Sequence, residues 1–275
     1  MSLTIAQTPV HPLRRLAEWL ARDRVVRRAL PADFGGRPVF FSPGNRLRAW
    51  LPDVERIEPE LIALVRRLVR PGMQVWDVGA NMGAFALPAA HRVGPRGRVL
   101  AVEPDPFNQL LLHRSLAHPR NRDLALTVVP AALSDGIGMA ELTVAARGRA
   151  ANSLKGAAHG SQMGAHRTSL PVVTLTLDWL AERFSPPDLV KCDAEGAETW
   201  ILAGAAHLLR TARPVFVMEV PHENAESCTD RFHAADYRLF PADRPIEPSR
   251  ALPEIADAWE IIAIPAERLS LHAGR

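Results

Sequence analysis

Residues 74–83 read QVWDVGANMG, and this stretch decides the fold. It predicts a strand over 74–79 that turns directly into a helix over 82–92. A glycine turn at such a junction brings the backbone close to a ligand and exposes the free N–H groups of the helix start. The spacing is not the GxGxxG of dinucleotide-binding turns. Asp77 places a carboxylate before the turn, which favours a cationic or zwitterionic ligand over a pyrophosphate.

Working outward, predicted strands and helices alternate along the chain, and the strands are apolar runs. Such runs are typical of a parallel sheet that helices cover on both faces. We therefore predict an α/β fold of the doubly wound, Rossmann-like type with seven strands. The six further strands are expected at 98–103, 124–129, 188–193, 214–220, 237–240 and 259–264, and the further helices at 58–69, 106–116, 177–183 and 197–209.

Two regions stand outside this alternation. Residues 1–57 are predicted to form an extension, with a helix over 13–30 and a hairpin of strands 39–41 and 47–51, preceding a main domain over 58–275. The segment 145–169 is rich in Ala, Gly, Ser and His and shows no clear period. A long irregular loop inside a compact domain is usually functional or disordered. A mobile lid over an active site and a plain surface insertion both remain open.

Composition predicts a cytoplasmic protein with neither a nucleic-acid partner nor a membrane span. Apolar residues make up 47% of the chain, and charges interrupt every apolar stretch well before the length of a membrane helix. The two cysteines have no metal-binding spacing. The net charge of +3 comes with arginines clustered at 14–28, which an amphipathic helix explains and which has no interleaved aromatic residues. That apolar helix also makes a homodimer possible.

Acidic and small residues follow the second and third predicted strands. Glu103, followed by Pro104, ends the second strand, where a carboxylate can bind both ribose hydroxyls of NAD or of S-adenosylmethionine (SAM). The third strand runs into PAALSD at 130–135, where small residues leave room for an adenine ring and either Ser134 or Asp135 can meet its amino group. An ordinary turn explains the same residues equally well.

The fourth and fifth strands end in a dense group of charged residues. KCDAEGAE at 191–198 places Lys191 and Asp193 on one face of the strand, and a buried lysine there needs a carboxylate partner. Acidic residues at 195 and 198 can instead complement a helix dipole. Glu219 ends the fifth strand, and His222 follows it as a candidate general base.

The ordered set DVGANMG, EPDP, AALSD, TLD and KCDAEGAE resembles the FkbM-type methyltransferases over about residues 58–220. The resemblance implies a SAM-dependent enzyme of the class I fold, with the last of seven strands antiparallel. It implies methylation of hydroxyl groups on sugars or natural products. The resemblance assigns the methionine end of SAM to Asp77, Gly79, Asn81 and Gly83, the ribose to Glu103, the adenine to Ala132, Leu133 and Ser134, and the neighbourhood of the transferred methyl to Asp193.

Methyl transfer to oxygen is an in-line displacement in which the hydroxyl proton must be removed or shared. Our hypothesis is that Asp193 and His222 flank the acceptor, that one of them is the base, and that Glu219 orients base or substrate. Lys191 joins them as a charged group of the catalytic site. A second version places a divalent cation on Asp193, Glu219 and His222. An NAD-dependent oxidoreductase and a non-catalytic SAM-fold binding protein remain as alternative functions.

Overall fold

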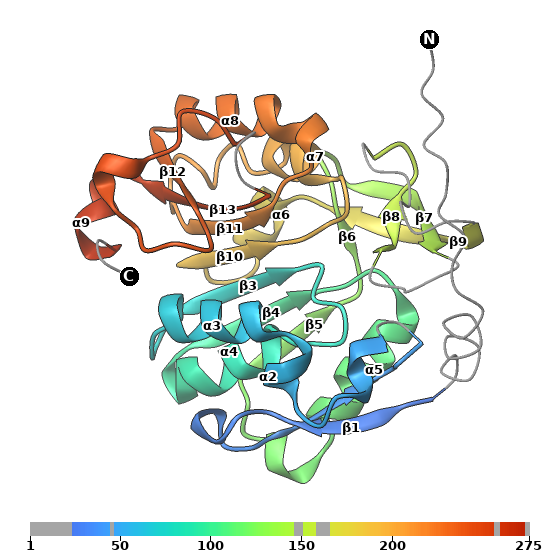
Figure 1. The fold of residues 1–275 in the computed structure, drawn as a ribbon. Coiled ribbons are helices and arrows are strands. Elements are labelled where there is room, and N and C mark those ends of the chain that lie inside the picture. The colour runs from blue at the N-terminus through green and yellow to red at the C-terminus, as the bar shows by residue number, and fades with distance from the viewer. Residues whose placement is uncertain (1–23, 45–46, 146–150, 158–165, 256–258, 273–275) are drawn as a thin grey trace, which may run out of the picture.

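A seven-stranded mixed sheet forms the centre of the molecule in this computed structural model (Figure 1). The structure describes residues 24–44, 47–145, 151–157, 166–255 and 259–272. The strand order is β5-β4-β3-β10-β11-β13-β12, and β13 is antiparallel to both of its neighbours. The bounds are β3 Gln74–Val78, β4 Arg98–Val102, β5 Leu126–Val129, β10 Leu189–Cys192, β11 Val215–Glu219, β12 Tyr237–Pro241 and β13 Glu260–Pro265. All seven predicted strands are confirmed, as is the antiparallel last strand.

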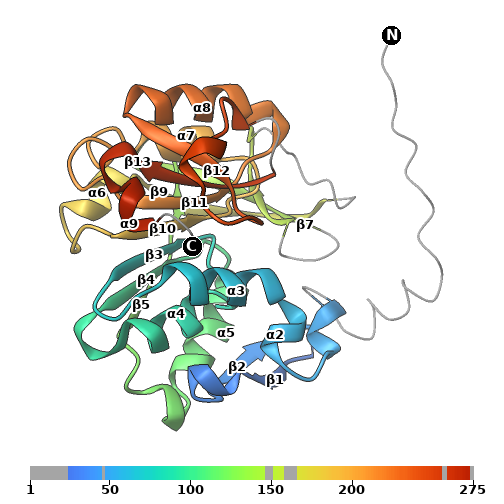
Figure 2. The same cartoon turned by 60° about the vertical axis from the view of Figure 1, so that its left-hand side comes forward.

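Each strand of the sheet feeds two hydrophobic cores because its side chains alternate between the faces. On β3, Val75 packs on one face, and Trp76 and Val78 pack on the other. One face is covered by α3, α4 and α5 and the opposite face by α6, α7 and α8 (Figure 2). These helices span α3 Pro59–Leu68, α4 Ala86–Val93, α5 Pro106–Leu116, α6 Leu177–Ala181, α7 Glu198–Ala203 and α8 Ala225–Ala234. The doubly wound α/β fold is therefore confirmed.

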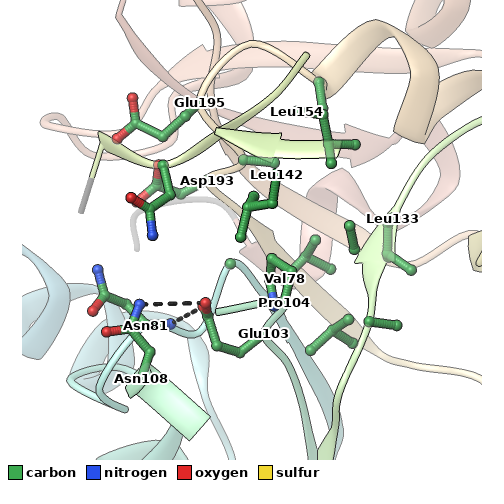
Figure 3. Close-up of a pocket in the computed structure, with 17 residues that line it drawn as sticks. Val78, Asn81, Glu103, Pro104, Asn108, Leu133, Leu142, Leu154, Asp193 and Glu195 are labelled. Atoms are coloured by element: carbon green, nitrogen blue, oxygen red, sulfur yellow. Dashed lines mark hydrogen bonds between the residues drawn. The ribbon is translucent and has the colours of Figure 1, made fainter. Parts of the chain in front are cut away.

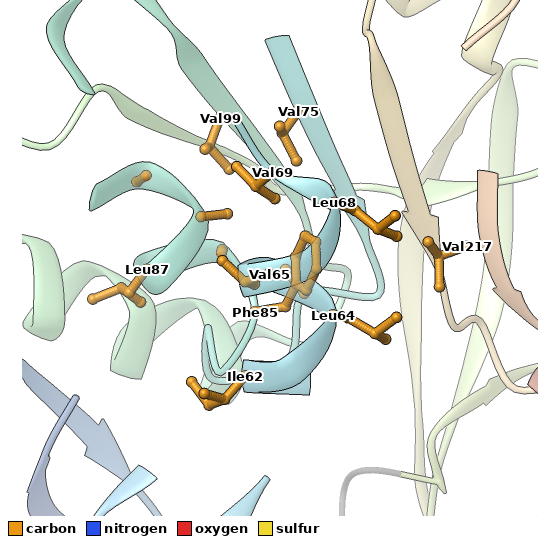
Figure 4. Close-up of a cluster of buried hydrophobic side chains, with 14 of the residues drawn as sticks. Ile62, Leu64, Val65, Leu68, Val69, Val75, Phe85, Leu87, Val99 and Val217 are labelled. Atoms are coloured by element: carbon orange, nitrogen blue, oxygen red, sulfur yellow. The ribbon is translucent and has the colours of Figure 1, made fainter. Parts of the chain in front are cut away.

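Helix α3 shows how the sequence produces this packing. Pro59 stands at its first position, where a missing N–H costs nothing. Ile62, Val65 and Leu68 recur at helical spacing and are fully or almost fully buried in the hydrophobic core on this side of the sheet (Figure 4). Truncating one such leucine to alanine costs about 2–5 kcal/mol of unfolding free energy. Packing therefore holds the helix in position, and the helix in turn holds the strands that it covers.

A second, four-stranded sheet was missed by the sequence analysis. It has the order β6-β9-β7-β8, with β6 Ala132–Leu133, β7 Gly138–Ala145, β8 Ser153–Leu154 and β9 His166–Leu175. Over residues 141–144 of β7, the buried Leu142 and Val144 alternate with the partly exposed Glu141 and Thr143, which is the period of a strand. The segment 145–169 is thus not wholly irregular, and the prediction of a lid now concerns residues 146–150 and 158–165, outside the described residues.

The N-terminal prediction is wrong in part. Residues Val26–Ala29, expected as the end of a helix, form β1, which pairs antiparallel with β2 at Pro38–Phe41. Residues Leu47–Trp50 form a 3-10 helix and not the partner strand, followed by the short helix α2 at Val54–Ile57. The hairpin turn uses Gly35 and Gly36, both at positive φ. Residues 13–23, where a dimer contact was expected, lie outside the described residues.

The chain ends in α9 at Leu269–His272. No helix among the described residues is long and apolar enough to cross a membrane.

Asn121 fastens the N-terminal hairpin to the main domain. It is 1% exposed, and its Nδ2 donates to the carbonyls of Pro38 at 2.8 Å and of Ser115 at 2.7 Å. The hydroxyl of Ser115 accepts a further bond from the N–H of Phe40. The carbonyl of Ser115 also accepts from the N–H of His118 at 3.3 Å, so of the two it is the carbonyl of Pro38 that depends most on this side-chain amide.

We predict that Asn121→Ala lowers the free energy of unfolding by about 1–2 kcal/mol, because the buried carbonyl of Pro38 loses its side-chain donor and that of Ser115 loses one of its donors. Urea denaturation measures the change. The exposed neighbour Arg122 provides the control, and Arg122→Ala should stay within about 0.5 kcal/mol of the parent. Equal losses in the two variants would contradict the role given to Asn121.

Candidate active site

A cavity lies at the carboxyl ends of β3, β4 and β10, where open α/β sheets bind ligands. Its space, open solvent included, is about 580 Å³, within the size range of small-molecule sites. The lining residues are Val78, Gly79, Asn81, Val102, Glu103, Pro104, Asn108, Ala131, Ala132, Leu133, Leu142, Asn152, Leu154, Asp193, Ala194, Glu195 and Ala197. Of the predicted cofactor residues, Gly79, Asn81, Glu103, Pro104, Ala132, Leu133 and Asp193 are brought together here.

Glu103 is held rigidly at the centre of this cavity wall. Its Oε2 accepts from the N–H of Asn81 at 2.7 Å, and its Oε1 accepts from the N–H of Asp105 at 2.9 Å and from Asn108 Nδ2 at 3.3 Å (Figure 3). Glu103 is only 4% exposed. Burial raises the pKa of Glu103 to about 7, although the three donors oppose the rise. The carboxylate is thus oriented before any ligand arrives.

The cavity has a polar end and an apolar end (Figure 3). Val78, Leu133, Leu142 and Leu154 gather at the apolar end, away from the carboxylates of Asp193 and Glu195. Flat apolar walls of this kind suit an aromatic base. Sequence reasoning missed the wall formed by β7 and β8, although the alternation around Leu142 could have revealed it.

Asn152, also missed, secures that wall. Its Nδ2 donates to Asp105 Oδ2 at 2.6 Å, and its Oδ1 accepts from the N–H of Ala145 at 3.0 Å. Asp105 caps α5, with its Oδ1 accepting from the N–H of Phe107. The segment that carries β8 is therefore bonded to Asp105 at the start of α5, and the N–H of Asp105 also bonds to Glu103.

The turn after β3 requires glycine at position 79. Gly79 has a φ of +71°, and a Cβ there would lie 1.9 Å from the main-chain oxygen of Asp193. Asn81 also has a positive φ, of 50°, and its Oδ1 is buried with no hydrogen bond among the described residues. The ends of β3 and β10 therefore touch through their backbones.

Three predicted cofactor residues lie outside the cavity lining. Asp77 is fully buried behind it. A Cβ on Gly83 would meet Leu87 and Leu112, so Gly83 serves the packing of α4 and α5. The hydroxyl of Ser134 bonds to Asp135, and its N–H donates to the carbonyl of Leu175. Strand alternation explains why Asp77 is absent from the lining. It directs the side chain of Asp77 to the sheet face that α3 covers, and the side chain of Val78 to the cavity.

Lys191 joins the carboxylates of two strands. Its Nζ lies 3.5 Å from Asp77 Oδ1, 3.4 Å from Asp193 Oδ2 and 3.4 Å from the carbonyl of Gly79. Burial alone would lower the pKa of Lys191, but the carboxylates of Asp193, Asp77 and Glu219 outweigh it and hold that pKa above its ordinary value. Burial raises the pKa of Asp77, and the ammonium opposes the rise. Lys191 thus has two carboxylate partners, Asp77 and Asp193, where the sequence predicted one.

Glu195 and Glu219 complete a group of carboxylates at this edge. Burial, with Asp193 nearby, raises the pKa of Glu195 to about 8 and that of Glu219 to about 7. Glu195 has a φ of 50°, an uncommon conformation for a non-glycine residue. Glu198 stabilises the loop that holds it, since Glu198 Oε1 accepts from the N–H groups of Ala194 and Gly196. These carboxyl groups can therefore exchange protons near neutral pH.

His222 does not join this group. It is exposed, begins a short 3-10 helix over His222–Asn224, and does not border the cavity. Among the described residues, no three His, Cys, Asp or Glu side chains are placed to hold a metal ion. The predicted pairing of Asp193 with His222, and the cation site on Asp193, Glu219 and His222, are both corrected. The reason is local: Pro221 and the 3-10 turn carry His222 away from the end of β11.

Comparison with known proteins decides the family. The profile of the methyltransferase FkbM domain matches residues 77–240. The chain belongs to the FkbM methyltransferase family. It is therefore a SAM-dependent methyltransferase, and the topology of its sheet gives it the class I fold.

Several known proteins resemble this FkbM methyltransferase. Hexuronic acid methyltransferase AglP of Haloferax volcanii is 27% identical over 221 residues, covering 76% of this chain and 82% of the relative. Ribosomal RNA large subunit methyltransferase E of Nitratidesulfovibrio vulgaris is 57% identical over 37 residues, 14% of this chain and 18% of that protein. The solved structure of methyltransferase FkbM from Methylobacillus flagellatus KT has a TM-score of 0.47 and 15% identity, covering 80% of this chain and 61% of that one.

The residues of this FkbM methyltransferase fit SAM. The orphaned Oδ1 of Asn81 and the half-buried carboxylate of Asp193 can meet the amino-acid end. Glu103 can accept from the ribose hydroxyls, and the apolar walls around Leu133 and Leu142 can enclose the adenine. When bound, SAM supplies an electrophilic methyl group on a sulfonium centre.

We predict that this methyltransferase binds SAM about tenfold more weakly at pH 6 than at pH 8. The ribose hydroxyls donate to an ionised carboxylate, and Glu103, with a pKa of about 7, becomes protonated as the pH falls. Calorimetric titration at several pH values measures the dissociation constant. Glu103→Gln should bind weakly with little pH dependence; a parent affinity that is flat between pH 6 and 8 would contradict the role of Glu103.

Proposed function

We propose that the enzyme transfers the methyl group of SAM to a hydroxyl group of a small molecule, a sugar or a natural product such as a polyketide, peptide or glycoside. The observation that carries the proposal is the group of carboxylates beside the cofactor cavity, with Asp193 and Glu195 lining it and Glu219 next to them. A hydroxyl becomes a competent nucleophile when a positioned base takes its proton. The relative named a hexuronic acid methyltransferase supports a sugar acceptor.

The carboxylates divide the work according to their surroundings. Asp193 lines the cofactor cavity and lies 3.4 Å from the ammonium of Lys191, which holds the carboxylate in place, so it serves to orient the acceptor hydroxyl. Glu219, with its pKa raised to about 7 by burial, takes the proton, because a base is most effective when its pKa lies near the working pH. Lys191 holds Asp193 in place and limits the repulsion among the carboxylates.

The acceptor atom can be tested directly. We would incubate the enzyme with SAM tritiated in the methyl group and with low-molecular-weight metabolites of the organism that encodes it. Label that survives mild alkali but is released as methyl iodide by hot hydriodic acid is a methyl ether, formed at a hydroxyl. Release of the label as methanol would indicate a carboxylate ester, and label only in macromolecules would exclude a small-molecule acceptor.

We predict that Glu219→Gln lowers kcat about 10²- to 10⁴-fold, because the amide cannot accept the hydroxyl proton. In the parent enzyme, kcat should rise with pH through about 7, as Glu219 ionises, and the variant should lose this rise. Its affinity for SAM should stay near that of the parent, because Glu219 does not border the cofactor cavity. Rates of label transfer at a series of pH values provide the measurement.

The exposed residue Glu226 on α8 gives the matched control, and Glu226→Gln should leave rate and pH profile unchanged. A Glu219→Gln enzyme that keeps the parent rate and pH profile would remove Glu219 from the chemistry.

A further inference from the structure

Trp259 lies beside the proposed base. It precedes β13, and its main-chain carbonyl accepts a bond of 2.9 Å from the N–H of Val220, at the end of β11. The indole Nε1 donates to Glu219 Oε2 at 3.3 Å. Despite these two attachments, Trp259 is 56% exposed. A large aromatic side chain is thus held in solvent contact at the carboxyl edge of the sheet.

The pair of Trp259 and Glu219 adjoins the cofactor cavity without being part of it. Neither residue lines that cavity. Glu219 ends β11, however, and the neighbouring strand β10 leads directly to Asp193, which does line it. Asp193 and Glu195 are close enough to Glu219 to interact with its charge. The pair therefore lies at the same end of the sheet as Asp193, next to the cofactor cavity.

An exposed indole beside a carboxylate is suited to a pyranose ring. The C–H groups on one face of a sugar carry slight positive charge and pack against the negative face of an aromatic ring. The hydroxyl groups at the ring's edge donate strong hydrogen bonds to an ionised carboxylate. The bond from Nε1 to Glu219 fixes the angle between the two groups, so the subsite is oriented in advance.

Charge narrows the kind of sugar that can bind. Among the described residues, the carboxylates of Asp193, Glu195, Glu219 and Glu260 interact electrostatically at this end of the sheet. Two cations act on them: Lys191, which lies between Asp77 and Asp193, and Arg67, which acts on Glu260. An added carboxylate on the acceptor ring would be desolvated and repelled by these carboxylates, which outnumber the cations beside them in the described part of the chain. An uncharged ring meets no such penalty.

We propose that Trp259 and Glu219 form the acceptor subsite of this enzyme and that the subsite takes an uncharged pyranose ring, not a uronic acid. This inference rests on the proposed function, because the ring must present its hydroxyl to the methyl of SAM.

The six tryptophans of the chain allow a direct test by fluorine NMR of protein that carries 5-fluorotryptophan. Trp259→Phe assigns the resonance of Trp259 by its loss. The protein, saturated with the demethylated cofactor S-adenosylhomocysteine, is titrated with the methyl β-glycosides of glucose and galactose and with the matched methyl glucuronide and galacturonide. Calorimetry on the same sample measures binding of S-adenosylhomocysteine separately.

We predict a saturable shift of the Trp259 resonance with at least one neutral glycoside. Trp179 of α6, whose ring packs against Arg183, is the control and should not respond. The matched uronide should bind at least about tenfold more weakly. Glu219→Gln should weaken binding of the neutral glycoside. It should also reduce the ratio between the dissociation constants of the uronide and the neutral glycoside, since one repelling charge is gone. Trp259→Ala should weaken glycoside binding up to about tenfold.

The outcomes separate this inference from the proposed function. Binding of S-adenosylhomocysteine with no response of Trp259 to either neutral glycoside would overturn the subsite and leave the methyltransferase function standing. Equal or tighter binding of the uronide would overturn the uncharged class. Absence of S-adenosylhomocysteine binding would refute the proposed function, and the inference with it.

Discussion

Lys191 is the group on which the rest of the site depends. Parallel pairing of β10 with β3 sets it opposite Asp77, and strand alternation sets Asp193 on the same face. Buried carboxylates of this density repel one another unless a cation lies among them. Because the ammonium lies within 3.5 Å of both aspartates and also binds the carbonyl of Gly79, it connects the first strand end to the fourth.

The cofactor cavity and the proposed acceptor subsite lie on either side of this contact between the ends of β3 and β10. The cofactor side consists of Glu103, fixed by three donors, and of apolar walls that β7 and β8 complete (Figure 3). The acceptor side, as proposed, consists of Glu219 and Trp259 on the neighbouring strands. Asp193 borders both sides. No side chain is tolerated at position 79, because a Cβ there would lie 1.9 Å from the main-chain oxygen of Asp193.

The sequence was sufficient to predict the seven-stranded sheet, because buried parallel strands are short apolar runs and their carboxyl ends carry the acidic residues. It also identified Gly79, Glu103 and Asp193. It could not place His222, whose direction depends on a 3-10 turn, or distinguish Gly83 as a packing residue. β1 was taken for a helix because its arginines and apolar residues fit both periods and only pairing with β2 decides between them. Trp259 went unnoticed because its role depends on contact with Glu219, 40 residues away.

The most direct test of the role of Lys191 is a double-mutant cycle followed by urea unfolding at pH 7. Lys191→Met alone should lower the free energy of unfolding by about 3–5 kcal/mol, because it leaves buried carboxylates without a cation. Adding Asp77→Asn should recover a large part of that loss, since the most deeply buried carboxylate is then neutral. Losses that simply add in the double variant would contradict the account, because Lys191 and Asp77 would then not be coupled.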